Sequence, residues 1–168
     1  MKHNHPKIEI MDTTLRDGEQ TSGVSFVPHE KLMIARLLLE DLKVDRVEVA
    51  SARVSEGEFD AVKMICDWAA RRNMLPKVEV LGFVDGHTSV DWIHATGCRV
   101  INLLCKGSLK HCSCQLKKSP EEHIEDILSV VDYANVQDME VNVYLEDWSN
   151  GMNCLLYTSD AADDLIGV

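Results

Sequence analysis

The stretch Arg46-Val47-Glu48-Val49-Ala50, followed by a helical pattern over Glu56–Arg72, decides the fold of this chain. In the first part, β-branched residues alternate with other side chains, as they do in a β-strand. The spacing then changes to that of an amphipathic helix, with apolar residues three and four positions apart. A strand followed directly by a helix is the repeating unit of a parallel sheet.

The same alternation continues on both sides of this unit. Further strands are expected over Lys7–Asp12, Lys77–Phe83, Arg99–Leu104 and Glu140–Glu146. Further helices are expected from Pro28 to Leu42, over Val90–Ala95, and from a capping box at Ser119 to Asn135. The sequence therefore predicts an α/β fold that forms the N-terminal five βα units of a (β/α)8 TIM barrel, which needs about 250 residues when complete.

The parity of the strand residues predicts which face is which. One set is β-branched and suits the side packed under helices: Ile8, Ile10, Val47, Val49, Val78, Val80, Val141 and Val143. The opposite set repeatedly includes a polar residue: Glu9, Met11, Glu48, Ala50, Glu79, Leu81, Asn102, Leu104, Asn142, Tyr144 and Glu146. Carboxylates under helices would be costly, so this set predicts a barrel interior that leads to an active site. The alternative is an exposed polar sheet face, although parallel sheets are normally covered on both sides.

Composition restricts the class of protein. The 168 residues include 17 basic and 28 acidic ones, which gives a net charge of −11. A nucleic-acid binder needs a basic face, so we expect no nucleic-acid partner. The start of the chain has no apolar signal-peptide core, and the richest apolar stretch contains charges, so we expect a cytoplasmic protein with no membrane partner. We expect the six cysteines to be reduced thiols, with Cys66 and Cys98 in the core.

The densest group of chemically active side chains is Asp12-Thr13-Thr14-Leu15-Arg16-Asp17-Gly18-Glu19-Gln20. It follows the first strand directly, and catalytic groups of α/β barrels lie at the carboxyl ends of strands. An arginine beside an aspartate can stabilise a developing enolate or alkoxide, while the aspartate oxygen suits Mg²⁺, Mn²⁺ or, with imidazoles, Zn²⁺. The alternative is a solvated charged loop with local ion pairs.

This string resembles the signature of the α-isopropylmalate, homocitrate and citramalate synthase family, which are metal-dependent acyl-CoA Claisen-condensing barrels. The resemblance covers about residues 7–152. Three further segments look most like bacterial citramalate synthases: Arg46 to Ser55, Leu81 to Gly86, and Tyr144 to Gly151. Residues 1–152 are therefore expected to form a partial TIM-barrel catalytic domain of the pyruvate carboxyltransferase and HMG-CoA-lyase-like type. Residues 153–168 lack the preceding pattern, and we expect a foreign or frameshifted tail there.

The resemblance also implies roles for individual residues. Arg16 matches the arginine that contacts the 2-keto acid, Asp17 matches the carboxylate metal ligand, and Gln20 matches a supporting substrate-binding position. Glu146 matches a carboxylate near the methyl group of acetyl-CoA and is the candidate base. The apolar pocket that selects the keto-acid side chain corresponds to Leu81, Leu104 and Tyr144.

The reaction implied by the resemblance joins acetyl-CoA, as co-substrate, to a 2-keto acid with the help of a divalent metal (Mg, Mn or Zn). Large residues in the pocket favour pyruvate and citramalate as product, in branched-chain (leucine and isoleucine) amino-acid biosynthesis. One alternative is a 2-isopropylmalate synthase acting on 2-oxoisovalerate. The full-length form is expected to be a homodimer.

A second alternative is an inactive fragment. The family completes its metal site with a His-x-His pair late in the barrel, and no such pair follows Gly151 in this sequence. His3 and His5 have the spacing but precede the first strand, so we expect them in a flexible terminus rather than in a metal site.

A second group of potential metal ligands is His111-Cys112-Ser113-Cys114. A structural zinc site normally needs ligands from two such groups, so the sequence favours a solvated loop after the fourth strand. Contact with CoA phosphates is an open alternative, because the same loop is basic through Lys106, Lys110, Lys117 and Lys118.

Overall fold

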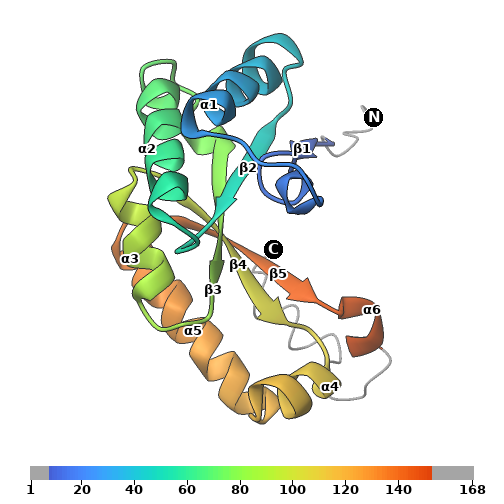
Figure 1. Ribbon diagram of the computed structural model, residues 1–168. Helices are drawn as coiled ribbons and strands as arrows, with labels where there is room; N and C mark the ends of the chain where they lie inside the picture. Colours follow the sequence, from blue (N-terminus) through green and yellow to red (C-terminus); the bar gives the residue numbers. More distant parts are fainter. Residues whose placement is uncertain (1–7, 153–168) are drawn as a thin grey trace, which may run out of the picture.

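A computed structural model of the chain describes residues 8–152. His3, His5 and the expected tail at 153–168 lie outside the described residues. Its strands pair only in parallel, in the order β1-β2-β3-β4-β5, and form one curled sheet (Figure 1). The strands are β1 (Met11–Asp12), β2 (Arg46–Ser51), β3 (Val78–Phe83), β4 (Val100–Lys106) and β5 (Glu140–Glu146). The predicted run of five parallel strands is confirmed.

Helices alternate with these strands, as the sequence predicts. Figure 1 shows α1, α2, α3 and α5 on the outer side of the curled sheet. The helices are α1 (Pro28–Arg36), α2 (Glu56–Ala70), α3 (Thr88–Ala95), α4 (Leu109–His111), α5 (Pro120–Val136) and α6 (Trp148–Gly151). Within residues 8–152, no helix has both the length and the apolar character needed to cross a membrane.

Local sequence signals explain where the two longest helices begin. Ser55 caps α2 by accepting a hydrogen bond from the backbone N–H of Glu58 at 3.1 Å. The capping box before α5 is confirmed, because Ser119 Oγ accepts from Glu122 N and Glu122 Oε2 accepts from Ser119 N. These caps satisfy N–H groups that a helix leaves unpaired at its start.

The predicted two faces of the sheet are present in its central strands. On the helix side, Val47, Val49, Val78 and Val80 are fully buried in one core cluster. Cys66 and Cys98 are buried in the same cluster, as expected. Burial of such side chains under helices is the main favourable contribution to the stability of this fold.

The prediction for the first strand is wrong in part. The strand comprises only Met11 and Asp12, and the side chains of Ile8 and Ile10 are 86% and 63% exposed. β1 lies at the edge of the sheet and pairs only with β2. Ile10 still contacts the next strand through its backbone, because its carbonyl accepts from Asp45 N and Arg46 N, but no helix covers its side chain.

The first helical run ends at Leu42, as the sequence predicts, but the expected place of Leu42 on its apolar face is wrong. Ala35, Leu38 and Leu39 are buried as expected, but Leu42 is 71% exposed. After Arg36 the helix widens into a π-helical segment over Leu37–Asp41. This wider turn changes the angular position of the following residues, so Leu42 leaves the face that packs on the sheet.

Candidate active site

The inward face of the curled sheet carries buried polar residues that bond to one another. Asn102 Nδ2 on β4 donates to Glu48 Oε1 on β2 at 2.8 Å. Asn142 Nδ2 on β5 donates to Asn102 Oδ1 at 2.9 Å. Glu48, Glu79 and Asn102 are at most 1% exposed. The prediction that this parity set forms a polar interior is confirmed.

Arg16 joins this interior to the carboxyl end of the strands. The turn after β1 is tightly wound, because Thr13 O accepts from the backbone N–H groups of both Arg16 and Asp17, at 3.1 and 2.8 Å. This turn directs the guanidinium inward, where Nε donates to Glu48 Oε2 at 2.5 Å. Nη1 donates to Asp17 Oδ1 at 2.8 Å. Nη2, the remaining nitrogen of the Arg16 guanidinium, has no hydrogen-bond partner among residues 8–152. Its N–H groups can therefore donate to a ligand.

Arg16 and Asp17 differ in their contact with solvent. The Arg16 side chain is 18% exposed, whereas that of Asp17 is 61% exposed. The structure thus brings the predicted pair together, with the cation held by the interior and the carboxylate open to the solvent. An ion pair with one partner tied to a fully buried carboxylate is held in place more firmly than a surface pair.

A cavity of about 330 Å³ lies beside Arg16, and Asp17 does not line it. Arg16 and Gln20 of the signature loop contribute to its wall. The facing wall comes from the end of β2 and the start of α2, including Ser51, Ser55 and Glu58. A hollow at the carboxyl end of parallel strands is the usual place of an active site in this architecture.

The three apolar pocket residues expected from the resemblance lie on the same inward face. Leu104 on β4 is directly opposite Tyr144 on β5, and Leu81 on β3 is opposite Asn102. Residues two apart on a strand share a face, so Leu81, Leu104 and Tyr144 adjoin the polar interior around Glu48. The sheet therefore places a polar cluster and an apolar wall next to each other.

Tyr144 also links the two edges of the sheet. Its hydroxyl donates to Met11 Sδ at 3.4 Å, from β5 to β1, which shows how strongly the sheet curls. Burial raises the pKa of Tyr144 to about 12, and the negative charges of Glu48 and Glu79 act in the same direction. At neutral pH Tyr144 is therefore an uncharged phenol, which suits a pocket for an alkyl group.

Glu146 is placed differently from the other expected residues. It ends β5, and its carboxylate pairs with the ammonium of Lys106 at the end of β4. The two residues lie at the carboxyl end of the sheet, as the signature loop does. The carboxylate of Glu146, however, pairs with Lys106 on the neighbouring strand rather than with Arg16. It is 43% exposed, so the carboxylate is accessible from the solvent.

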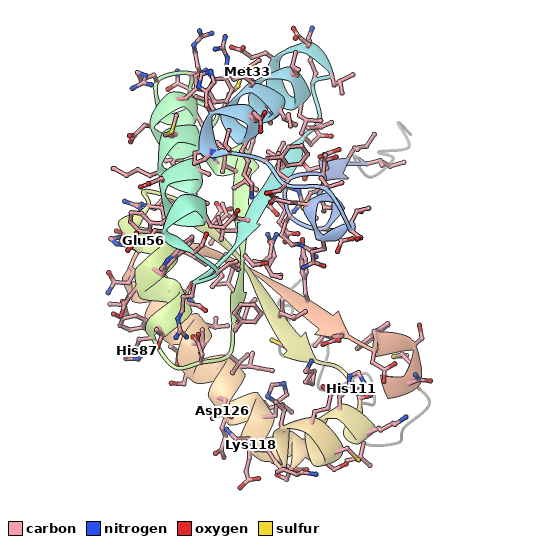
Figure 2. The ribbon with its side chains drawn as sticks, viewed as in Figure 1. Met33, Glu56, His87, His111, Lys118 and Asp126 are labelled. Atoms are coloured by element: carbon pink, nitrogen blue, oxygen red, sulfur yellow. The ribbon has the colours of Figure 1, made fainter. Side chains whose placement is uncertain are left out.

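The expected solvated loop after β4 has regular structure, and that prediction is wrong. Ser108 caps α4, which continues into a π-helical segment, Cys112–Leu116. Cys112 is buried there while Cys114 is exposed, and Figure 2 shows His111 beside α6. Lys118 pairs with Asp126 at the start of α5. The cap and these contacts give the segment an order that composition alone does not reveal.

No complete metal site is present within residues 8–152. That part of the chain contains no group of three or more His, Cys, Asp or Glu side chains able to hold an ion. Asp17 offers one exposed carboxylate, and its Oδ1 already accepts from Arg16. The described residues alone therefore do not fit the divalent metal that the resemblance implies.

Two residues that organise the site had no assigned role in the sequence. Glu48 and Asn102 were placed on the inward face by parity, but parity does not identify hydrogen-bond partners. The structure shows that Glu48 holds Arg16 and that Asn102 holds Glu48. The recurrence of polar residues at inward positions of neighbouring strands was the available signal.

Glu79 provides a test of the polar interior. Its Oε2 is buried without a hydrogen-bond partner among the described residues, and Arg46 Nη1 approaches Oε1 at 3.3 Å. Burial raises the pKa of Glu79, and contacts with Asn102 and Arg46 only partly oppose this rise. The folded state therefore favours the protonated acid more than the unfolded state does, and ionisation at neutral pH costs stability.

We expect Glu79→Gln to stabilise the 168-residue chain at pH 7.5, because it removes this cost. The gain should shrink as the pH falls through the raised pKa of the folded state. It should vanish below the unfolded pKa, about 4.3. Urea unfolding at pH 7.5 and pH 4 measures the difference. A variant that is less stable at pH 7.5 would contradict the assignment.

The geometry defines a class of protein. A curled parallel sheet with outer helices, a polar interior and a charged loop at the carboxyl strand ends is the architecture of the α/β-barrel enzymes. The HMGL-like family model matches residues 7–159, and the chain belongs to this family. The chain is 36% identical over 156 residues to a probable 2-isopropylmalate synthase of Ignicoccus hospitalis.

Other relatives carry related names. The chain is 37% identical over 142 residues to an (R)-citramalate synthase of Methanocaldococcus jannaschii. It is 39% identical over 142 residues to a homocitrate synthase of Methanopyrus kandleri. These three matches cover 92%, 83% and 84% of this chain but only 38%, 27% and 34% of the respective relatives. The chain thus spans between a quarter and two fifths of their length.

Solved structures show the same fold. An HMG-CoA lyase of Bacillus subtilis superimposes with a TM-score of 0.62 at 18% identity, over 83% of this chain and 46% of that one. An HMG-CoA lyase of Brucella melitensis gives a TM-score of 0.54 at 20% identity, over 82% of this chain and 48% of that one. The partial coverage fits five strands of a larger barrel.

Proposed function

We propose that this chain supplies the N-terminal part of the catalytic barrel of an enzyme that condenses acetyl-CoA with a 2-keto acid, namely pyruvate. The observation that carries the proposal is the Arg16 guanidinium, anchored inward by Glu48 and open at Nη2, at the carboxyl end of the strands. Relatives named as isopropylmalate, citramalate and homocitrate synthases support it.

The chemistry is a carbon–carbon bond formation. A base removes a proton from the acetyl-CoA methyl group, and the resulting enolate carbon attacks the ketone carbon of the keto acid. The electron pair of the ketone C=O bond moves to its oxygen. Arg16 donates hydrogen bonds to this oxygen as it becomes negative, which lowers the energy of the transition state. Water then cleaves the thioester and releases CoA.

Glu146 is the proposed base. Its carboxylate is exposed and lies at the carboxyl end of the sheet, where we propose that the substrates bind. Its ion pair with Lys106 has to open before the carboxylate can accept a proton. The role of Lys106 is then to hold the carboxylate of Glu146 until the substrate arrives.

The charge at the site limits how the keto acid binds. Arg16 carries one positive charge, and Glu48 and Asp17 carry one negative charge each, so the group as a whole is negative. A keto-acid carboxylate needs additional positive charge beside this group. We propose that Asp17 contributes one oxygen ligand to a divalent metal (Mg, Mn or Zn), whose other ligands come from outside the described residues.

Pocket size favours pyruvate. Leu81, Leu104 and Tyr144 share the inward face, although none of them lines the cavity beside Arg16. In the proposal, these large side chains restrict the space beside the ketone to about a methyl group. The second candidate is a 2-isopropylmalate synthase, which the 36% identity to two relatives of that name favours. The two candidates differ in substrate, pyruvate against 2-oxoisovalerate.

A chimera tests the proposal directly. In the chimera, the matched 142-residue segment of our chain replaces its counterpart in the M. jannaschii (R)-citramalate synthase. The expected result is release of CoA with pyruvate and a much lower kcat/KM with 2-oxoisovalerate. The reverse preference would favour the second candidate. A folded chimera that turns over neither keto acid would contradict both.

Leu104→Ala should change the substrate preference of this chimera. Removing the side chain opposite Tyr144 opens space for a branched alkyl group, and each methylene accommodated in such a pocket changes kcat/KM by about tenfold or more. We expect the ratio of kcat/KM for 2-oxoisovalerate to that for pyruvate to rise by at least about tenfold. Leu145→Ala is the matched control, because Leu145 points to the other face of the strand. An equal response of both variants would contradict the pocket assignment.

The absence of a complete ligand group within residues 8–152 favours a further possibility, that this chain alone has no catalytic activity. Calorimetric titration of the 168-residue chain with Mn²⁺ or Zn²⁺ tests whether Asp17 contributes to a metal site. Tight binding that Asp17→Asn abolishes would support a metal role for this carboxylate. Binding that is unaffected by Asp17→Asn would contradict it.

A further inference from the structure

Lys31 is a fully buried lysine that the chemistry above does not use. It lies in α1 on the same face as Ala35 and Leu38, which are packed in the core. Only 1% of Lys31 is exposed. An ammonium group in such surroundings is very costly unless its charge and its N–H groups are all matched.

Two carboxylates and a backbone carbonyl surround the ammonium of Lys31. Its Nζ lies 2.5 Å from Glu19 Oε2, 2.5 Å from Glu58 Oε1 and 3.2 Å from the carbonyl oxygen of Leu15. The contacts with Leu15 and Glu58 are hydrogen bonds, and the contact with Glu19 is an ion pair. Leu15 and Glu19 belong to the signature loop, whereas Glu58 belongs to α2. A single side chain therefore connects the loop to two helices.

Glu19 extends this connection along the loop. Its other oxygen, Oε1, accepts a hydrogen bond from Phe26 N at 2.8 Å. The loop between β1 and α1 is thus held at Leu15, at Glu19 and at Phe26. Leu15 and Glu19 line the cavity together with Arg16 and Gln20, which directly follow them, so the held positions form part of the cavity wall.

We propose that Lys31 is a positioning residue, which fixes the signature loop so that Arg16 faces Glu48 and the cavity. Lys31 itself is buried behind the loop and does not line the cavity. Its effect on turnover rests on the proposed function, whereas its effect on loop order does not. Without the ammonium, Glu19 and Glu58 would be two neighbouring carboxylates that repel each other, and the loop would separate from α2.

Hydrogen exchange in the 168-residue chain tests the loop order. The backbone N–H groups of Asp17 and Gly18 both donate to Thr13 O and report on the turn that holds Arg16. In Lys31→Met, we expect these amides to exchange at least about tenfold faster, while those of β3 and β4 keep their rates. Lys63→Met is the control, because Lys63 is 53% exposed and has only an i,i+4 contact with Asp67 at 3.9 Å.

A milder variant keeps the test valid if Lys31→Met does not fold. Glu19→Gln retains the Lys31–Glu58 ion pair between the helices and removes only the charge contributed by the loop. The same local acceleration is expected, in smaller degree. Unchanged exchange in the loop, or equal acceleration in β3 and β4, would overturn the proposal.

The chimera separates positioning from a general structural role. If Lys31 acts through Arg16, kcat falls in Lys31→Met by about tenfold or more, and Lys31→Met/Arg16→Ala is no slower than Arg16→Ala alone. Two effects that multiply would overturn the proposal. If the unchanged chimera is inactive, the proposed function fails, and the exchange experiment still decides the role of Lys31.

Discussion

Arg16→Ala is expected to lower the kcat of the chimera with pyruvate by about 100- to 1,000-fold, or roughly 3 kcal/mol in activation free energy. The guanidinium lies at the carboxyl end of the sheet, with its Nε held 2.5 Å from Glu48 Oε2. Its free edge stabilises the charge that develops on the ketone oxygen. Because this charge exists only in the transition state, kcat should fall more than KM rises.

The steady-state rate of CoA release measures this effect, and the chain offers a matched control. Arg36 in α1 is 49% exposed and contacts only Glu40, at 3.7 Å. Arg36→Ala should therefore leave kcat nearly unchanged. A near-normal rate for Arg16→Ala, or equal losses in both variants, would refute the role of Arg16.

Glu48→Leu is expected to destabilise the 168-residue chain by about 2 to 3 kcal/mol. Glu48 is fully buried and accepts from both Arg16 and Asn102. The leucine leaves the Asn102 amide without its acceptor in the interior, and it leaves Arg16 with Asp17 as its remaining ion-pair partner. The midpoint of urea unfolding measures the loss.

Glu48→Gln is the matched control for this variant. The amide nearly fills the same volume and its oxygen keeps one of the two hydrogen bonds, while its NH2 replaces the other acceptor, so the loss should be smaller, about 1 to 2 kcal/mol. In the chimera, both variants should also slow turnover, because Arg16 loses its inward anchor. A Glu48→Leu chain as stable as the original would show that the interior network does not hold the fold together.

The fold was predictable because its signals are local. Alternating residues such as Val47 and Val49 identify strands, the Ser119 capping box identifies a helix start, and parity identifies the inward face. The errors lie where a residue depends on distant parts of the chain. Ile10 has the right pattern for a buried strand residue, but β1 is an edge strand and the part of the chain that the structure describes leaves that side chain largely exposed.

The site was predictable only in part. The resemblance identified Arg16 and Asp17, but their partner Glu48 follows from the curl of the sheet, which no local pattern encodes. Lys31 shows the same limit. It occupies an apolar helix face, and only the assembled structure reveals the carboxylates of Glu19 and Glu58 that permit its burial.

Arg16, at the carboxyl end of this sheet, is proposed to bind the 2-keto acid. Titration of the ¹⁵N-arginine-labelled chimera with pyruvate, followed through the side-chain N–H signals, tests this contact most directly. We expect a saturable shift of the Arg16 signals, which are identified by their loss in Arg16→Lys, while the signals of Arg46 at the opposite end of β2 stay in place. Saturation by pyruvate without any change in the Arg16 signals would contradict it.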